Sequence, residues 1–125
     1  MSKKVLITGG NKGIGLAISR AMLEFGYEII IVARDFDTCP LVGVANVTCI
    51  EYDLSNVDGL PELVKEVGDI DILINNAGYM QPKYTYDNYP KEARDHIMNV
   101  DLYTPIELMN IFSVAMKKKG YGRIV

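Results

Sequence analysis

Apolar runs and amphipathic segments alternate along the chain, and this alternation predicts strands and helices in turn. Short stretches that are apolar on successive residues are typical of strands covered on both faces. The predicted strands are residues 4–7, 28–33, 47–52 and 70–74, with the start of a fifth at residues 122–125. Apolar residues at helical spacing predict helices at residues 14–25, 56–67 and 91–119.

Residues that favour turns and helix ends divide these segments. Ser55 is a plausible cap for the second helix, because its hydroxyl can accept a hydrogen bond from an unpaired N–H group. Pro105 lies inside the segment 91–119 and predicts a kink or a break there. Residues 34–45 are too few for a full crossover helix, and residues 79–90 read as a loop.

Strands that alternate with helices predict an α/β fold, in which a parallel sheet carries helices on both faces. Right-handed crossovers make such a sheet doubly wound. The chain has 125 residues, which fits one domain over 1–125 and not two. Ligands of these sheets bind outside the carboxyl ends of the strands, where the strand order reverses.

Composition and charge exclude several partners and sites. The net charge of −3 is too small to imply a nucleic-acid partner, and Lys117–Lys119 before Gly120 fit the end of a helix. No run approaches the ~20 apolar residues that cross a bilayer. Cys39 and Cys49 have no metal-ligand spacing, so we expect no metal site and a reduced, cytoplasmic protein.

A glycine-rich loop between the first strand and the first helix predicts a phosphate site. Gly9 allows a sharp turn, Gly13 leaves room for a phosphate near the backbone, and Gly15 allows close packing of the helix on the sheet. The N-terminus of the helix offers unpaired N–H groups to an anion. The candidate binding residues here are Thr8, Gly9, Asn11, Lys12, Gly13, Ile14 and Gly15.

The spacing Gly9-x-x-x-Gly13-x-Gly15 resembles that of the short-chain dehydrogenase/reductase family. Asp53-Leu54 after the third strand matches the position that borders adenine in that family. Asn75, Ala77 and Gly78 belong to Asn-Asn-Ala-Gly, which matches the segment that lies along the cofactor. The resemblance covers the whole chain, about the first half of a family member, and implies a Rossmann-like sheet truncated after the start of its fifth strand.

The resemblance also indicates which dinucleotide is bound. An acidic residue at the end of the second strand would bind the ribose hydroxyls of NAD, whereas a basic one accepts the extra phosphate of NADP. Those positions fall on Ala33 and Arg34, and Lys12 is the family's other phosphate-reading position, so we expect NADP. A shift of one residue at the strand end would place Asp35 at the ribose and favour NAD instead.

The family's catalytic residues are a serine, a tyrosine and a lysine four residues after that tyrosine. The resemblance places all three beyond Val125 and assigns only the supporting asparagine, to Asn99. The spacing of tyrosine and lysine occurs once, at Tyr79 and Lys83, but we expect no catalysis from it because it falls in a loop with Pro82 between. We expect His96 to be an ordinary helix residue.

Three functions remain open from the sequence. The leading one is the cofactor-binding half of an NADP(H)-dependent oxidoreductase acting on a small carbonyl or alcohol, inactive by itself. The others are a non-catalytic dinucleotide-binding module and one half of a split enzyme. An apolar edge on the fourth strand would invite association, so we expect a homo-oligomer or a missing C-terminal half.

Overall fold

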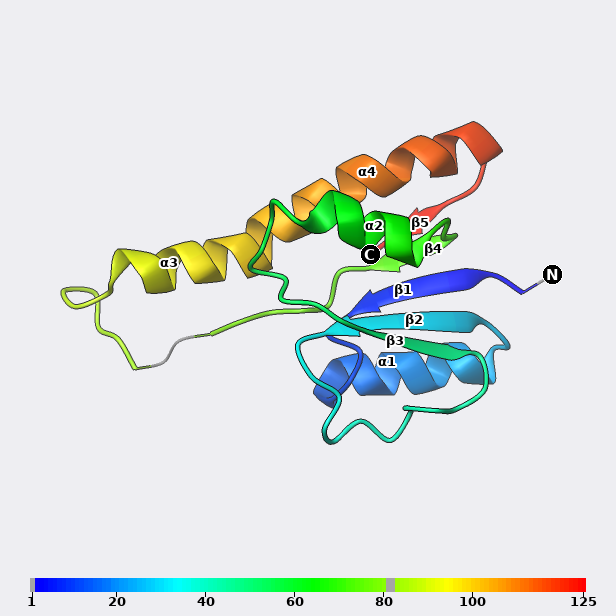
Figure 1. Ribbon diagram of the computed structural model, residues 1–125, viewed down its shortest axis with the longest axis horizontal. Coiled ribbons are helices and arrows are strands. Elements are labelled where there is room, and N and C mark those ends of the chain that lie inside the picture. Colours follow the sequence, from blue (N-terminus) through cyan, green and yellow to red (C-terminus); the bar gives the residue numbers. More distant parts are fainter. Residues whose placement is uncertain (1, 81–82) are drawn as a thin grey trace.

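The computed structural model describes residues 2–80 and 83–125, which form one parallel sheet with helices on both faces (Figure 1). The strands are β1 (Lys4–Thr8), β2 (Glu28–Ala33), β3 (Val47–Glu51), β4 (Ile72–Ile74) and β5 (Arg123–Ile124). Their order across the sheet is β3-β2-β1-β4-β5. The Rossmann-like, doubly wound arrangement predicted from the sequence is therefore confirmed.

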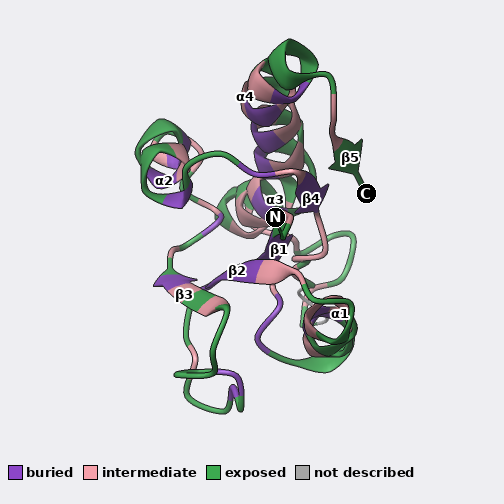
Figure 2. Ribbon diagram, turned by 90° about the vertical axis from the view of Figure 1, so that its right-hand side faces the viewer, coloured by how far each residue is buried: buried purple, intermediate pink, exposed green. Residues whose placement is uncertain are grey.

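The helices divide between the two faces of the sheet (Figure 2). They are α1 (Gly13–Glu24), α2 (Leu60–Val67), α3 (Lys91–Met98), the π-helix η1 (Asn99–Tyr103) and α4 (Thr104–Lys119). Helix α1 packs on one face, while α2 and α4 pack on the other. Helix α3 extends beyond the end of the sheet, and residues 34–46 cross over without a regular helix, as expected.

Two apolar cores result, because successive side chains of a strand point to opposite faces. In β1, Val5 and Ile7 pack in the core beneath α1, while Leu6 packs in the core beneath α2 and α4. All three side chains are fully buried. Unbroken apolar runs such as the one in β1 are what a sheet covered on both faces requires.

The strand order reverses between β1 and β4. From β1 the chain moves outward to β2 and β3, and then returns to the other side of β1 as β4. Thr8 pairs with Val32, and Ile7 pairs with Ile74, so the carboxyl ends of β1, β2 and β4 lie together. Segments that leave these ends diverge and leave space between them, where ligands of such sheets bind.

Helix α2 begins later than the sequence predicted, and Ser55 does not cap it. The helix starts at Leu60, and its N-cap residue is Gly59. The Ser55 hydroxyl instead donates a hydrogen bond to the Asp53 carboxylate, and the side-chain carbonyl of Asn56 accepts one from the N–H of Gly59. Short polar side chains can satisfy the backbone in turns in this way, and here they hold residues 53–59 out of the helix.

The irregularity predicted at Pro105 occurs one turn earlier. Pro105 lies at the start of α4, and the preceding turn widens into the π-helix η1. Proline has no N–H group and crowds the carbonyl four residues before it, so the widened turn relieves a conflict that a continuous α-helix would suffer. The end of α4 is as predicted: Gly120 has φ 75° and donates its N–H to the carbonyl of Lys117.

Strand β5 covers more of β4 than the sequence suggested. The N–H of Val125 donates to Leu73, and the carbonyl of Val125 accepts from the N–H of Asn75. The exposed edge is therefore that of β5, not β4.

Residues 79–90 form a loop where they are described, and Pro82, which stands between Tyr79 and Lys83, lies outside the described residues. Over residues 2–80 and 83–125, no helix combines the length and apolarity needed to cross a bilayer.

Candidate functional site

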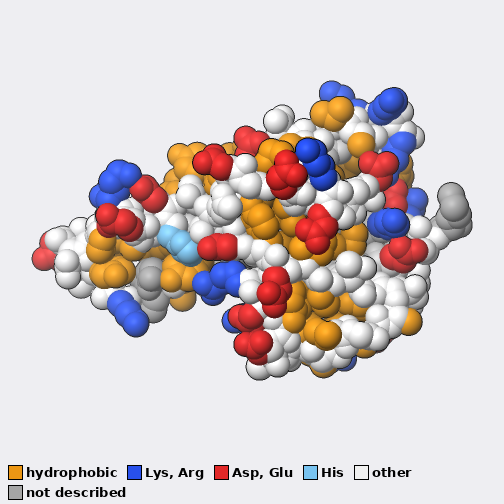
Figure 3. All heavy atoms as spheres, in the orientation of Figure 1, with side chains coloured by type: hydrophobic (Ala, Val, Ile, Leu, Met, Phe, Trp, Pro, Cys, Tyr) orange, Lys and Arg blue, Asp and Glu red, His pale blue; other side chains and the backbone are white. Residues whose placement is uncertain are grey.

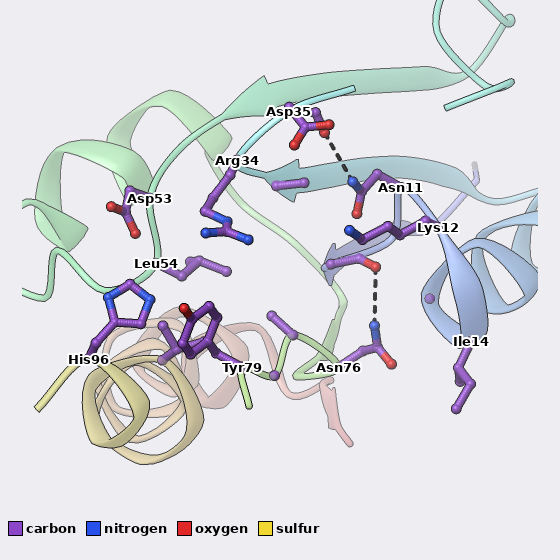
Figure 4. A pocket seen from close by; sticks show the side chains of 16 residues that line it. Asn11, Lys12, Ile14, Arg34, Asp35, Asp53, Leu54, Asn76, Tyr79 and His96 are labelled. Carbon is purple, nitrogen blue, oxygen red and sulfur yellow. Dashed lines mark hydrogen bonds between the residues drawn. The ribbon is translucent and has the colours of Figure 1, made fainter. Parts of the chain in front are cut away.

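A cleft of about 280 Å³ opens where the strand order reverses (Figure 4). It is lined by the glycine-rich loop, by the ends of β2 and β3, by the segment after β4 and by α3 and η1. The lining residues are Gly9, Asn11, Lys12, Ile14, Gly15, Ala33, Arg34, Asp35, Asp53, Leu54, Asn76, Ala77, Gly78, Tyr79, His96 and Val100. On the face drawn in Figure 3, side chains of both charges and the histidine gather beside a hollow between the α3 arm and the sheet.

The glycine-rich loop closes tightly against its neighbours. Gly9 has φ +67°, a backbone conformation that glycine adopts readily, and its N–H donates to the carbonyl of Val32 at 2.8 Å. A Cβ atom on Gly15 would lie 2.0 Å from the carbonyl oxygen of Gly9, so no larger residue fits there without movement. The loop therefore delivers the first turn of α1, with its N–H groups, to the edge of the cleft.

Asn76 joins this loop to the segment after β4. Its side-chain amide donates to the carbonyls of Thr8 and Gly9 at 3.1 and 3.2 Å. Figure 4 draws the bond to Gly9 as a dashed line. In return, the Thr8 hydroxyl accepts hydrogen bonds from the N–H groups of Asn76 and Ala77 at 3.1 and 3.0 Å. These bonds fix the floor of the cleft across two strands far apart in sequence. We call this set of hydrogen bonds between Thr8, Gly9, Asn76 and Ala77 the clasp. The sequence motif contains Asn76, but these partners are visible only in the structure.

Two cations approach the cleft from different elements. Lys12 precedes α1, and Arg34 follows the last residue of β2, Ala33. Both side chains are exposed, and among the described side chains Arg34 makes no ion pair with its neighbour Asp35. The carbonyl of Asp35 accepts a hydrogen bond from the buried Asn11 side chain at 3.0 Å, which ties the end of β2 to the loop.

The end of β3 contributes one apolar and one acidic side chain. Leu54 is buried in the wall of the cleft, and Asp53 lies exposed at its rim. The hydroxyl and N–H of Ser55 donate to the Asp53 carboxylate at 2.7 and 3.0 Å. These bonds hold the pKa of Asp53 below its ordinary value, with smaller contributions from His96 and Arg34. Asp53 thus presents a charged acceptor beside an apolar surface.

Tyr79 and His96 both line the cleft, and the sequence did not reveal the contact between them. Their rings meet edge to face with centroids 4.3 Å apart, and Arg34 approaches the Tyr79 ring with its Cζ atom 5.6 Å from the centroid. His96 was expected to be an ordinary helix residue, yet it lines the cleft, and among residues 2–80 and 83–125 its buried Nε2 atom has no hydrogen-bond partner. No sequence spacing relates residues 34, 79 and 96, so only the fold brings them together.

Four of the predicted site residues are absent from the cleft lining: Thr8, Gly13, Asn75 and Asn99. The Thr8 side chain is buried in the clasp described above, and the N–H of Asn75 pairs with β5. Asn99 donates its side-chain amide to the carbonyl of Ser55 at 3.2 Å, which joins η1 to the turn after β3. The structure thus gives Thr8, Asn75 and Asn99 contacts that support the walls, whereas Gly13 faces open space.

The assembled groups suit an elongated, phosphorylated ligand. A helix N-terminus and two cations can bind phosphate groups, whereas Leu54 and Val100 offer an apolar surface to a flat ring. The described part of the chain contains no group of three histidine, cysteine or acidic residues that could hold a metal ion. These groups could together hold a ligand that carries both phosphate groups and an aromatic ring.

Curated relatives and solved structures agree with this architecture. The chain is 35% identical over 133 residues to the ketoacyl reductase HetN of a Nostoc species, covering 98% of the chain and 46% of that protein. It is 28% identical to an acetoacetyl-CoA reductase of Shinella zoogloeoides, covering 100% of the chain and 54% of that protein. The chain thus spans about half the length of the curated relatives it matches.

Two solved structures illustrate the likeness of the fold. A metagenomic short-chain oxidoreductase in complex with NADP superposes with a TM-score of 0.86 at 26% identity, over 98% of this chain and 59% of that one. A 4-hydroxyisoleucine dehydrogenase complexed with NADH gives a TM-score of 0.87 at 23% identity, over 98% of this chain and 54% of that one. The family model described as short chain dehydrogenase matches residues 3–125, and the chain therefore belongs to the short-chain dehydrogenase family.

Proposed function

We propose that this chain binds NADP(H) in preference to NAD(H), as the cofactor-binding part of an oxidoreductase that acts on a small carbonyl or alcohol. Family membership supports the oxidoreductase class. The finer assignment depends mainly on one observation: Lys12 and Arg34 line the same cleft, and no acidic residue ends β2. Two cations on one phosphate would form charge-assisted bonds, and the guanidinium of Arg34 can bind two oxygens at once.

The register of the sheet favours NADP over NAD. Ala33 is the last residue of β2 and pairs with Glu51 of β3, so the position for a ribose-binding acid falls on an alanine. Asp35 lies two residues further on, and its carbonyl is held by Asn11. The neighbour solved in complex with NADP, at 26% identity, supports this proposal.

The remaining cleft residues fit the rest of a dinucleotide. In this proposal the first turn of α1, including Ile14 and Gly15, binds the pyrophosphate, and the tight approach of Gly15 to Gly9 leaves the backbone open to it. Asp53 and Leu54 border the adenine, while Ala77 and Gly78 lie along the cofactor. Thr8, Gly13, Asn75 and Asn99 support these segments. A bound nicotinamide would donate or accept hydride.

We further propose that the chain alone binds cofactor without turning over substrate. Residues matching the family's catalytic serine, tyrosine and lysine are not among its 125 residues, apart from the Tyr79–Lys83 spacing in a loop. Cys39 and Cys49 are both free, which fits a reducing compartment such as the cytoplasm.

Titration of two variants with NADPH and NADH tests the nucleotide preference. Arg34→Ala is expected to weaken NADPH binding by about tenfold or more, because a charge-assisted bond to the extra phosphate is lost, and to leave NADH binding nearly unchanged. Arg20→Ala is a matched control, because Arg20 is also exposed but lies on α1 outside the cleft lining. Equal losses for both dinucleotides in Arg34→Ala would exclude the phosphate-reading role.

Hydride transfer separates the alternatives of a binding module and a split enzyme. The purified chain is expected to bind NADPH and to reduce no carbonyl substrate, because it lacks the proton donor. Activity that appears only when a second chain bearing the serine and the tyrosine–lysine pair is added would support a split enzyme. Measurable turnover by the chain alone would contradict the proposal of a binding half.

A further inference from the structure

The Tyr79 ring lies between two residues that come from opposite sides of the cleft. Arg34 reaches it from the end of β2, and His96 contacts it from α3 (Figure 4). The Cζ atom of Arg34 is 5.6 Å from the ring centroid, within the range in which a cation is attracted to the face of an aromatic ring. Arg34 is also the cation that we assigned above to the extra phosphate of the nucleotide.

The backbone of Tyr79 is fixed by the π-helical turn. Its N–H donates to Oδ1 of Asp101 in η1 at 2.8 Å, across 22 residues of sequence. The same helical region holds the opposite wall, because the buried Thr104 hydroxyl donates to the carbonyl of Leu54 at 2.6 Å. The turn before Pro105 therefore connects both sides of the cleft and sets where the Tyr79 ring lies.

An exposed arginine has much to gain from such a support. Its side chain loses rotamer freedom when it is fixed, and that loss weakens any phosphate contact it makes. A ring that already holds the guanidinium reduces this loss, since part of the ordering precedes binding. Arginine stacks on aromatic faces through its planar group, and its N–H groups remain free at the edge to bind oxygen atoms.

We propose that Tyr79 is a positioning residue that orients the Arg34 guanidinium for the extra phosphate of NADP(H), and that Asp101 holds Tyr79 in place. This inference rests on the proposed function, since it takes the anion read by Arg34 to be the phosphate on the adenosine ribose. The nucleotide preference then depends on Tyr79 as well as on Arg34, although Tyr79 lies outside the end of β2. NADH lacks this phosphate and gains nothing from the stack.

Variants of Tyr79 test the role of the ring. Tyr79→Leu removes the aromatic face and is expected to weaken NADPH binding about two- to fivefold, the range for a cation–ring contact at an exposed site. Tyr79→Phe keeps the ring and is expected to restore the NADPH affinity. The ratio of NADPH affinity to NADH affinity should fall in Tyr79→Leu and stay unchanged in Tyr79→Phe, and circular dichroism checks that each variant is folded.

A double-substitution cycle with Arg34 separates positioning from a general structural effect. In an Arg34→Ala background, Tyr79→Leu is expected to cause no further loss of NADPH affinity, because the ring then has no guanidinium to orient. An equal loss in both backgrounds would overturn the inference. A gain in affinity for NADPH and NADH alike on Tyr79→Leu would also overturn it, since the ring would then be occupying space needed by adenine.

Variants of Asp101 test the anchor without depending on any dinucleotide. The chain has no tryptophan, so Tyr79→Trp provides a single tryptophan at this position, whose fluorescence can be excited selectively. Adding Asp101→Ala is expected to raise the quenching of this reporter by acrylamide, whereas Asp101→Asn, which keeps an acceptor oxygen, should leave it unchanged. Unchanged quenching in Asp101→Ala would overturn the anchoring role.

The titrations with NADPH and NADH distinguish a failure of the inference from a failure of the proposed function. If the unsubstituted chain binds neither NADPH nor NADH, the proposed function fails and the positioning of Arg34 for NADP fails with it. If the chain prefers NADPH and loses that preference in Arg34→Ala but keeps it in Tyr79→Leu, the proposed function stands and the role of Tyr79 is wrong.

Discussion

Among the glycines, Gly15 is the one at which an added Cβ atom would lie closest to another atom. A Cβ atom there would lie 2.0 Å from the carbonyl oxygen of Gly9 and 2.5 Å from the side-chain amide of Asn76. The first neighbour is backbone, which cannot rotate away as a flexible side chain can. Gly15→Ala is therefore expected to lower the free energy of unfolding by about 2 kcal/mol or more and to weaken dinucleotide binding, as measured by denaturant unfolding and titration. The effect opposes the gain in helix propensity, about 1 kcal/mol, that alanine brings.

Gly78→Ala is the matched control for this substitution. Gly78 also lines the cleft, but a Cβ atom on it would have its nearest neighbour, Oδ1 of Asp101, at 3.9 Å, an ordinary contact distance. Its unfolding free energy should stay within about 0.5 kcal/mol of the parent, the usual range for substitutions away from special features. A similar loss at both positions would show that the clash at Gly15 relaxes.

Individual residues could be predicted from the sequence only where a local motif specifies them. Gly9 and Gly15 follow from a loop whose backbone geometry requires glycine, and the structure places both at the cleft. The contact of His96 with Tyr79 could not be found this way, because it joins α3 to the loop after β4. A motif also could not tell that the Thr8 side chain would be buried in the clasp, since that depends on how two strands pair.

Asp71 connects three secondary-structure elements. Its carboxylate accepts from the N–H of Lys4 at the start of β1 at 2.9 Å, and from the ammonium of Lys119 at the end of α4 at 2.8 Å. The bond from Lys119, followed by that from Lys4, holds the pKa of Asp71 below its ordinary value. Both side chains are partly exposed, so Asp71→Ala is expected to cost only about 1–2 kcal/mol in chemical unfolding at neutral pH.

The pH dependence of this effect has a definite sign. Because the folded protein lowers the pKa of Asp71, the stabilisation is complete above the unfolded value, about 3.9, and is lost as the pH falls through the folded value. The difference in unfolding free energy between the parent and Asp71→Ala should be constant near neutral pH and should shrink below about pH 4. A difference that grows on acidification would contradict the assignment.

At the scale of elements, the apolar pattern predicted strands well and helix boundaries less well. Strands β1 and β2 are buried on both faces, so their apolar runs are unambiguous. The start of α2 was predicted four residues too early, because Ser55 is a good cap in isolation but pairs with Asp53 in the fold. Pro105 predicted an irregular helix, yet it takes the form of a π-helical turn whose Asn99 and Asp101 contact Ser55 and Tyr79 on the two sides of the cleft.

At the scale of the whole molecule, the doubly wound parallel sheet and the position of the cleft followed from general rules. Alternating strands and helices with right-handed crossovers leave few arrangements, and the point where strand order reverses is where ligands bind. The sequence could not show that β5, with only two residues, would pair with β4 and become the edge of the sheet. That pairing depends on the short turn at Gly120, which brings the chain back beside β4.

The edge at β5 predicts self-association of the chain. Ile124 and Val125 are 41% and 75% exposed, and an uncovered edge strand offers unpaired N–H and carbonyl groups to another chain. Ile124→Lys is expected to shift sedimentation towards the monomer at high protein concentration, because a charge on the edge opposes pairing. Val114→Lys is the comparison variant, since Val114 is 69% exposed on α4 and is not part of this strand. If only Val114→Lys reduces association, the contact between chains is made by α4 and not by the edge of the sheet. The short length of β5 alone would then protect that edge from pairing with another chain.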